Sequence, residues 1–117
     1  MDGVYYDAKG NLLGITPDVV TIDLSKKFPR KLDVIDIVHR YGGENQKLKA
    51  CEELCELQEA ILKDINKQVD CGVVEEIADV YIMLAQLEVV YDIDTLDLVE
   101  MISYKLDRQH ERMKAGI

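Results

Sequence analysis

The sequence has little tryptophan, phenylalanine, proline or cysteine. It has no Trp, one Phe, two Pro and three Cys. The cysteines, Cys51, Cys55 and Cys71, form no CxxC pair and are odd in number, which argues against a disulfide framework or a zinc knuckle. We therefore expect reduced, partly buried thiols. The apolar runs are short, and no basic region precedes an apolar stretch near the start. We expect neither a membrane span nor a secretory signal, and a cytoplasmic protein.

Basic residues are also in the minority. Lys and Arg number 14 and Asp and Glu number 23, so the formal net charge is −9. An acidic surface repels phosphate backbones and anionic lipids, and we therefore expect no nucleic-acid or membrane partner. Apolar residues make up 48% of the 117 residues, which is enough for one packed core. We expect a single domain over residues 1–117.

The first 30 residues differ in pattern from the rest. Two β-leaning runs, at residues 4–6 and 12–15, flank a loop that contains glycine, and together they predict a hairpin. Residues 19–24 have the composition of a third short strand. This segment is too small to be a domain. We expect residues 1–30 to form an N-terminal arm on a helical core that covers residues 31–117.

Beyond residue 30 the apolar residues recur with the period of a helix. One short helix ends at Gly42-Gly43. Three longer helices are predicted over residues 46–65, 73–91 and 95–113. Asp94 is placed to cap the last of them. The fold class predicted is all-α, a bundle of three long helices and a short one with a small β-hairpin arm.

Two of the long helices each carry a pair of acidic residues three positions apart, Glu53 with Glu56 and Glu76 with Asp79. Side chains three apart project side by side, so two such helices packed together can bring four carboxylates to one point. Glu76 and Asp79 fall inside an apolar stripe, with Glu75 and Gln86 at its edge. That stripe contains Val80, Met83, Leu87 and Val90.

Buried carboxylates need compensation, because the charged form is poorly solvated inside a protein. Salt bridges to lysine or arginine, protonation and a bound cation are the three ways to supply it. An all-oxygen donor set suits Mg²⁺, or Mn²⁺, better than zinc. The alternative without a bound ion is that Glu52, Glu53 and Glu56 form a solvated acidic face. A di-iron site needs Glu-x-x-His on two helices, and the chain offers only Asp107-x-x-His110.

The remaining charged and apolar faces have two interpretations each. Gln46 and Lys49 share a helix face with Glu53 and Glu56. A wide apolar arc beside that face is either core or subunit interface: Leu48, Cys51, Leu54, Cys55, Ile61, Leu62 and Ile65. The last helix carries a basic strip that is either a solvated face or a grip on phosphate: Lys105, Arg108 and Arg112. His39 and His110 are expected at the surface or in packing.

The acidic pairs and the helix break between them resemble a known pattern. Glu52-Glu53-Leu-Cys-Glu56 followed by Glu76-Ile-Ala-Asp79 resembles the EExxE…ExxD motif of the MazG-type all-α nucleoside triphosphate pyrophosphohydrolases. Lys105-Leu-Asp-Arg108 resembles the Lys-Leu-x-Arg element of that family's last helix. The resemblance covers residues 40–113 and looks closest to short, phage-like members.

This resemblance implies Mg²⁺-dependent cleavage of a nucleoside triphosphate between the α and β phosphates, giving a monophosphate and pyrophosphate. By the same resemblance the metal ligands and catalytic residues are Glu53, Glu56, Glu76 and Asp79. It also implies a homo-oligomer, a dimer or a tetramer. We expect Glu56 to accept a proton from water. We expect Lys49 and the basic strip to contact pyrophosphate, and Gln46 to touch phosphate, sugar or base.

Two other functions remain open from the sequence. One is a regulatory protein that binds nucleotide and metal without turnover. The other is a purely structural helical oligomer whose acids are paired with lysines.

Overall fold

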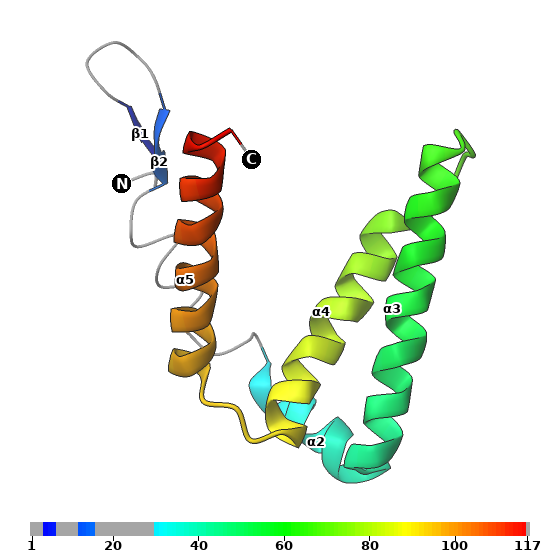
Figure 1. Cartoon of the computed structure of the whole chain (residues 1–117). Helices are drawn as coiled ribbons and strands as arrows, with labels where there is room; N and C mark the ends of the chain where they lie inside the picture. Colours follow the sequence, from blue (N-terminus) through cyan, green and yellow to red (C-terminus); the bar gives the residue numbers. More distant parts are fainter. Residues whose placement is uncertain (1–3, 7–11, 16–29, 117) are drawn as a thin grey trace. The chain divides into compact units, whose positions relative to one another are not determined.

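The computed structural model describes residues 4–6, 12–15 and 30–116 (Figure 1). Its elements, in chain order, are β1 (Val4–Tyr6), β2 (Leu12–Ile15), α2 (Lys31–Tyr41), α3 (Gly43–Ile65), α4 (Val73–Val90) and α5 (Thr95–Lys114). The prediction of an all-α protein is confirmed, since most described residues are helical. Each predicted helix is present with bounds within three residues of those expected.

The two strands pair antiparallel, with Val4 opposite Ile15 and Tyr5 opposite Gly14. The register then shifts by one position, so that Tyr6 lies opposite Leu12. Residues 19–24, for which a third strand is expected, lie outside the described residues.

Internal contacts divide the chain into two compact units. One contains α2, α3 and α4 and spans Phe28–Ile93; the other contains β1, β2 and α5. The expected single domain over 1–117 stays a prediction. None of the described helices is both long enough and apolar enough to cross a membrane.

Glycines mark where the helices break. Gly42 has φ 88°, and its N–H donates to the carbonyl of Val38 at 2.8 Å, which ends α2 and allows α3 to begin at once. A side chain at position 42 would be strained by this backbone conformation, which glycine adopts freely. Gly72, at φ 71°, precedes α4 in the same way. Asp94 caps α5 as predicted, because its carboxylate accepts a 2.8 Å hydrogen bond from the Leu96 N–H.

Helices α3 and α4 run antiparallel side by side, and α2 packs against both (Figure 1). The buried apolar residues of this unit are Val34, Val38, Ala50, Ala60, Val80, Met83 and Ala85. Three of these seven are alanines. Small side chains let the two long helices approach closely along their facing sides. Gly43 has the same effect at the end of the pair, since a Cβ there would lie 3.3 Å from a methyl carbon of Val90.

One buried polar contact joins the two long helices. The side-chain amide of Gln46 donates a 2.7 Å hydrogen bond to the Oε1 of Gln86. Gln86 is 2% exposed, so its predicted place at the edge of the apolar stripe is wrong. Burial there is tolerable because Gln86 Oε1 accepts from Gln46, and the Gln86 amide nitrogen donates to Met83 Sδ at 3.5 Å. Glu75, predicted at the same edge, is exposed.

Candidate metal centre

The register of α3 against α4 decides which acids meet. Gln46 lies opposite Gln86. Two helical turns further along α3, and two turns back along α4, Glu53 comes opposite Asp79. Three further residues along each helix bring Glu56 opposite Glu76. The two i, i+3 pairs found in the sequence therefore fall at the same level of the antiparallel helix pair.

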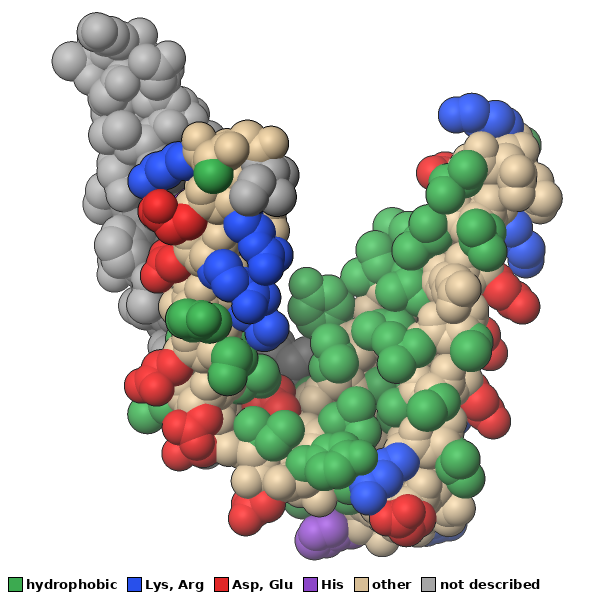
Figure 2. All heavy atoms as spheres, in the orientation of Figure 1, with side chains coloured by type: hydrophobic (Ala, Val, Ile, Leu, Met, Phe, Trp, Pro, Cys, Tyr) green, Lys and Arg blue, Asp and Glu red, His purple; other side chains and the backbone are tan. Residues whose placement is uncertain are grey.

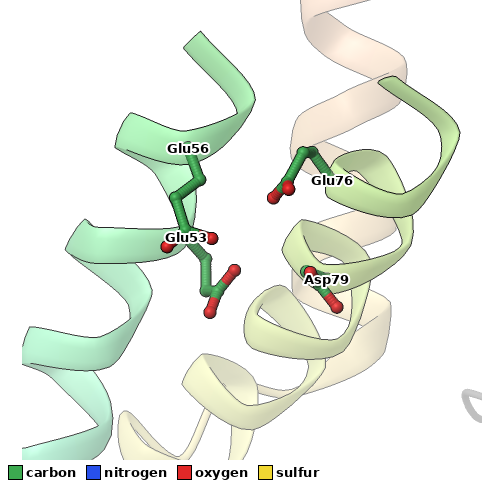
Figure 3. Close-up of side chains that lie close together, drawn as sticks. All are labelled: Glu53, Glu56, Glu76 and Asp79. Carbon is green, nitrogen blue, oxygen red and sulfur yellow. The ribbon is translucent and has the colours of Figure 1, made fainter. Parts of the chain in front are cut away.

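The four carboxylates converge in this register (Figure 3). Glu53 and Glu56 extend from α3, and Glu76 and Asp79 extend from α4 into the same space. One carboxylate oxygen from each residue lies within 4.8 Å of the others. The predicted meeting of the two acidic pairs is confirmed. We call these residues, Glu53, Glu56, Glu76 and Asp79, the carboxylate quartet.

Burial differs among the members of the quartet. Glu53 is 8% exposed, Glu76 and Asp79 are half-buried, and Glu56 is exposed. The buried Oε2 atoms of Glu53 and Glu76 accept no hydrogen bond from any described residue. A buried anionic oxygen without a partner is costly, and native proteins rarely leave one so. The site therefore has two acceptors that need a cation or a proton.

Repulsion and burial raise the proton affinity of two members of the quartet, Glu56 and Glu76. The pKa of Glu56 lies above its ordinary value, mainly because of the nearby charge of Glu53. The pKa of Glu76 is also raised, first by its removal from water and then by the charge of Asp79. Both shifts have the direction expected of like charges gathered without sufficient compensation.

One basic side chain touches the quartet. Lys49 Nζ lies 3.2 Å from Glu53 Oε1 and 3.5 Å from Glu52 Oε2. Among the described residues, it is the one Lys or Arg paired with a quartet carboxylate. Salt bridges to lysine therefore compensate one member of four. The alternative of a solvated acidic face is wrong for Glu53, which is buried, whereas Glu52 and Glu56 are exposed.

A divalent ion fits this donor set. Mg²⁺ takes oxygen ligands at about 2.0–2.1 Å in an octahedral arrangement and commonly keeps several waters. Oxygens within 4.8 Å of one another can ligate one such ion after small side-chain adjustments. Mn²⁺ accepts the same ligands. Donor chemistry alone does not choose between these two ions.

The other predicted site residues lie in several places. Gln46 is 7% exposed and is engaged with Gln86 in the interior. The basic strip of Lys105, Arg108 and Arg112 is exposed on α5, in the other unit, where the Arg108 guanidinium lies 5.8 Å from the centre of the Tyr104 ring. The expected contacts of these four residues with a nucleotide stay predictions.

The cysteines and histidines take no part in the quartet. Both His39 and His110 are exposed, which is one of the two placements expected for them. All three cysteines are free thiols. Cys51 and Cys55 are exposed, so the expectation of partly buried thiols is wrong for these two. They lie on the side of α3 that the other two helices of the unit leave uncovered.

Sequence reasoning missed two contacts. The Gln46–Gln86 hydrogen bond depends on the register of two helices 40 residues apart in the chain, for which the sequence carries no direct signal. The Lys49–Glu53 ion pair has the i, i+4 spacing typical of helix salt bridges, so that signal was present.

Comparisons of the chain with models of known protein families, with curated proteins and with solved structures found no match.

Proposed function

We propose that this chain is a Mg²⁺-dependent nucleoside triphosphate pyrophosphohydrolase of the MazG type. The observation that carries the proposal is the carboxylate quartet, with its two buried oxygens that have no partner in the described structure. The EExxE…ExxD spacing in the sequence supports the same assignment. The products are a nucleoside monophosphate and pyrophosphate.

The quartet residues have different parts in this proposal. Glu53, Glu76 and Asp79 are the more buried members and hold the ion. A bound Mg²⁺ supplies charge neutralisation for the phosphates and lowers the pKa of water. Glu56 is exposed and its pKa is raised, which suits an acceptor for the proton that water loses as its oxygen bonds to phosphorus. The bond between the α and β phosphates then breaks, and pyrophosphate leaves.

A second copy of the chain is part of the proposal. Large apolar side chains on α3 are 44% to 66% exposed: Leu48, Leu54, Ile61, Leu62 and Ile65. On α4, Tyr81 is 60% and Leu84 is 48% exposed. Figure 2 shows hydrophobic side chains gathered over these two helices. Monomeric proteins rarely expose so much contiguous apolar surface, and a homodimer or homotetramer removes it from water.

Turnover is the experiment that tests this function. The full chain is incubated with Mg²⁺ and each of the common ribonucleoside and deoxyribonucleoside triphosphates, and pyrophosphate and monophosphate are measured. We expect both products in equal amounts from at least one substrate. Glu53→Gln and Asp79→Asn should abolish turnover and leave the helical circular dichroism unchanged, while the neighbouring Glu75→Gln should retain activity.

The other outcomes have distinct meanings. Release of orthophosphate in place of pyrophosphate would overturn the assigned bond. Stabilisation by nucleotide and metal without any product would favour the regulatory binding protein. Retention of most activity in both Glu53→Gln and Asp79→Asn would reject the quartet as the active site.

A further inference from the structure

Within the described part of the chain, Lys49 is the one Lys or Arg paired with the quartet, and its placement is asymmetric. Its ammonium contacts Oε1 of Glu53 at 3.2 Å, whereas Oε2 of the same carboxylate is buried and has no partner. The two oxygens of Glu53 are thus in different states. Oε1 is paired with a half-exposed lysine, and Oε2 has no partner among the described residues.

The geometry on α3 favours this arrangement. Lys49 precedes Glu53 by four residues and Glu52 by three, so both carboxylates lie within reach of one ammonium. The side chain of Glu52 is 65% exposed and that of Glu53 is 10% exposed, so the lysine contacts one carboxylate in solvent and one in the site.

We propose that Lys49 is a built-in counter-ion of the carboxylate quartet. It holds Oε1 of Glu53, leaves Oε2 as the oxygen that Glu53 offers to a divalent ion, and weakens the binding of that ion through its own charge. This inference rests on the proposed metal site and adds to it a residue that sets the affinity.

The direction of the effect follows from electrostatics. A positive charge in contact with a ligand carboxylate repels any cation that the quartet binds. Because Lys49 is 49% exposed at its side chain, water and salt screen much of this repulsion. Removing the charge while keeping the aliphatic stem should therefore tighten binding of a divalent ion by about 3- to 10-fold at low salt.

The experiment is a titration of the full-length chain with Mn²⁺, in which free Mn²⁺ is measured by electron paramagnetic resonance. Lys49→Met should bind Mn²⁺ about 3- to 10-fold more tightly than the wild-type chain, and the ratio should fall toward one in about 0.5 M KCl. Lys49→Arg keeps the charge, so this variant should bind Mn²⁺ with an affinity within about 2-fold of the wild-type chain. Lys49→Gln provides a second neutral variant if Lys49→Met fails to fold.

Lys47→Met is the matched control. Lys47 lies on the same helix, but it pairs with Glu44 at 2.8 Å and lies 4.8 Å from the centre of the Tyr91 ring, so its removal should leave Mn²⁺ affinity unchanged. Equal or weaker binding by Lys49→Met, when the wild-type chain binds Mn²⁺, would overturn the role of Lys49 and leave the metal site standing. Absence of Mn²⁺ binding by the wild-type chain would overturn the metal site, and the counter-ion with it.

Discussion

Gln46 and Gln86 face each other in the interior between α3 and α4, and the amide of Gln46 donates a 2.7 Å hydrogen bond to Gln86. The pair lies two helical turns from Glu53 and Asp79 along the same two helices. A buried polar pair among apolar side chains favours one register, because sliding the helices would leave both amides unsatisfied. The level at which the acids meet is therefore linked to this contact.

Breaking this pair on one side should destabilise the protein more than replacing both partners. Gln46→Met leaves the buried Oε1 of Gln86 without its donor and should lower the free energy of unfolding by about 1–3 kcal/mol. The double variant Gln46→Met, Gln86→Met buries two apolar side chains of similar volume and should recover most of that loss. Urea denaturation of the wild-type chain, the single variants Gln46→Met and Gln86→Met, and the double variant measures the difference. A double variant as unstable as the sum of the two single variants would show that the pair contributes no coupling.

Glu76→Gln should stabilise the metal-free protein. Oε2 of Glu76 is buried and has no partner among the described residues, and the charge of Asp79 lies close to it. A neutral amide removes the repulsion and can donate to a neighbouring carboxylate. We expect the variant to have a higher urea midpoint than the wild-type chain without metal. Adding Mg²⁺ should raise its midpoint by less than that of the wild-type chain. The carboxylate therefore costs stability for the sake of function. Glu75→Gln, at an exposed position on the same helix, is the control and should change neither value.

The stability of the metal-free protein should fall as Glu56 and Glu76 lose their protons. The pKa values of Glu56 and Glu76 are raised above 4.5 in the folded protein, so the folded state binds these protons more tightly than the unfolded chain does. Between about pH 4.5 and the raised pKa values, the unfolded state therefore releases protons first, and stability contributed by these groups declines as pH rises. Above both values the full cost of the ionised site is present.

Divalent metal should reverse this trend. We expect the gain in thermal midpoint on adding Mg²⁺ to be larger at pH about 7.5 than at pH about 5, because protons compete with the ion for the same oxygens. Thermal unfolding with and without Mg²⁺ at the two pH values measures this, and Glu76→Gln should flatten the dependence. A gain from Mg²⁺ that is equal at both pH values, or larger at the lower one, would show that the ion does not bind to the titrating carboxylates.

The exposed apolar side chains of α3 and α4 should hold copies of the chain together. The double variant Ile61→Lys, Leu84→Lys places two charges on this surface and should shift a dimer or tetramer to monomer in light scattering coupled to size exclusion. Glu59→Lys, at an exposed polar position of α3, should leave the assembly intact. A wild-type chain that is monomeric at all accessible concentrations would contradict the proposed oligomer.

Much of the helical structure could be predicted because its signals are local. Gly42 and Gly72 break the helical pattern where a left-handed or similar positive-φ backbone is needed, and Asp94 is a standard cap. The two acidic pairs are visible as i, i+3 spacing within single helices. Their meeting required that α3 and α4 pack antiparallel, which a short connection between long helices favours, and that they do so in the register that places Gln46 opposite Gln86.

Contacts set by packing could not be predicted in the same way. Helical periodicity places Gln86 only to within the width of a face, so an edge position and a buried one are not distinguished. The apolar arc of α3 fits both core and subunit interface for a similar reason, because periodicity marks a face without naming what covers it. Leu54 and Ile61 are 47% and 44% exposed, and the subunit interface stays a prediction.

Direct measurement of divalent-ion binding tests the central claim most sharply. Isothermal titration of the wild-type chain with Mn²⁺ should show saturable binding of an ion at the quartet, and Glu53→Gln, Asp79→Asn should abolish it while α-helical circular dichroism is retained. No binding at millimolar Mn²⁺, or equal binding by the wild-type chain and the double variant, would show that the four converging carboxylates are not a metal site.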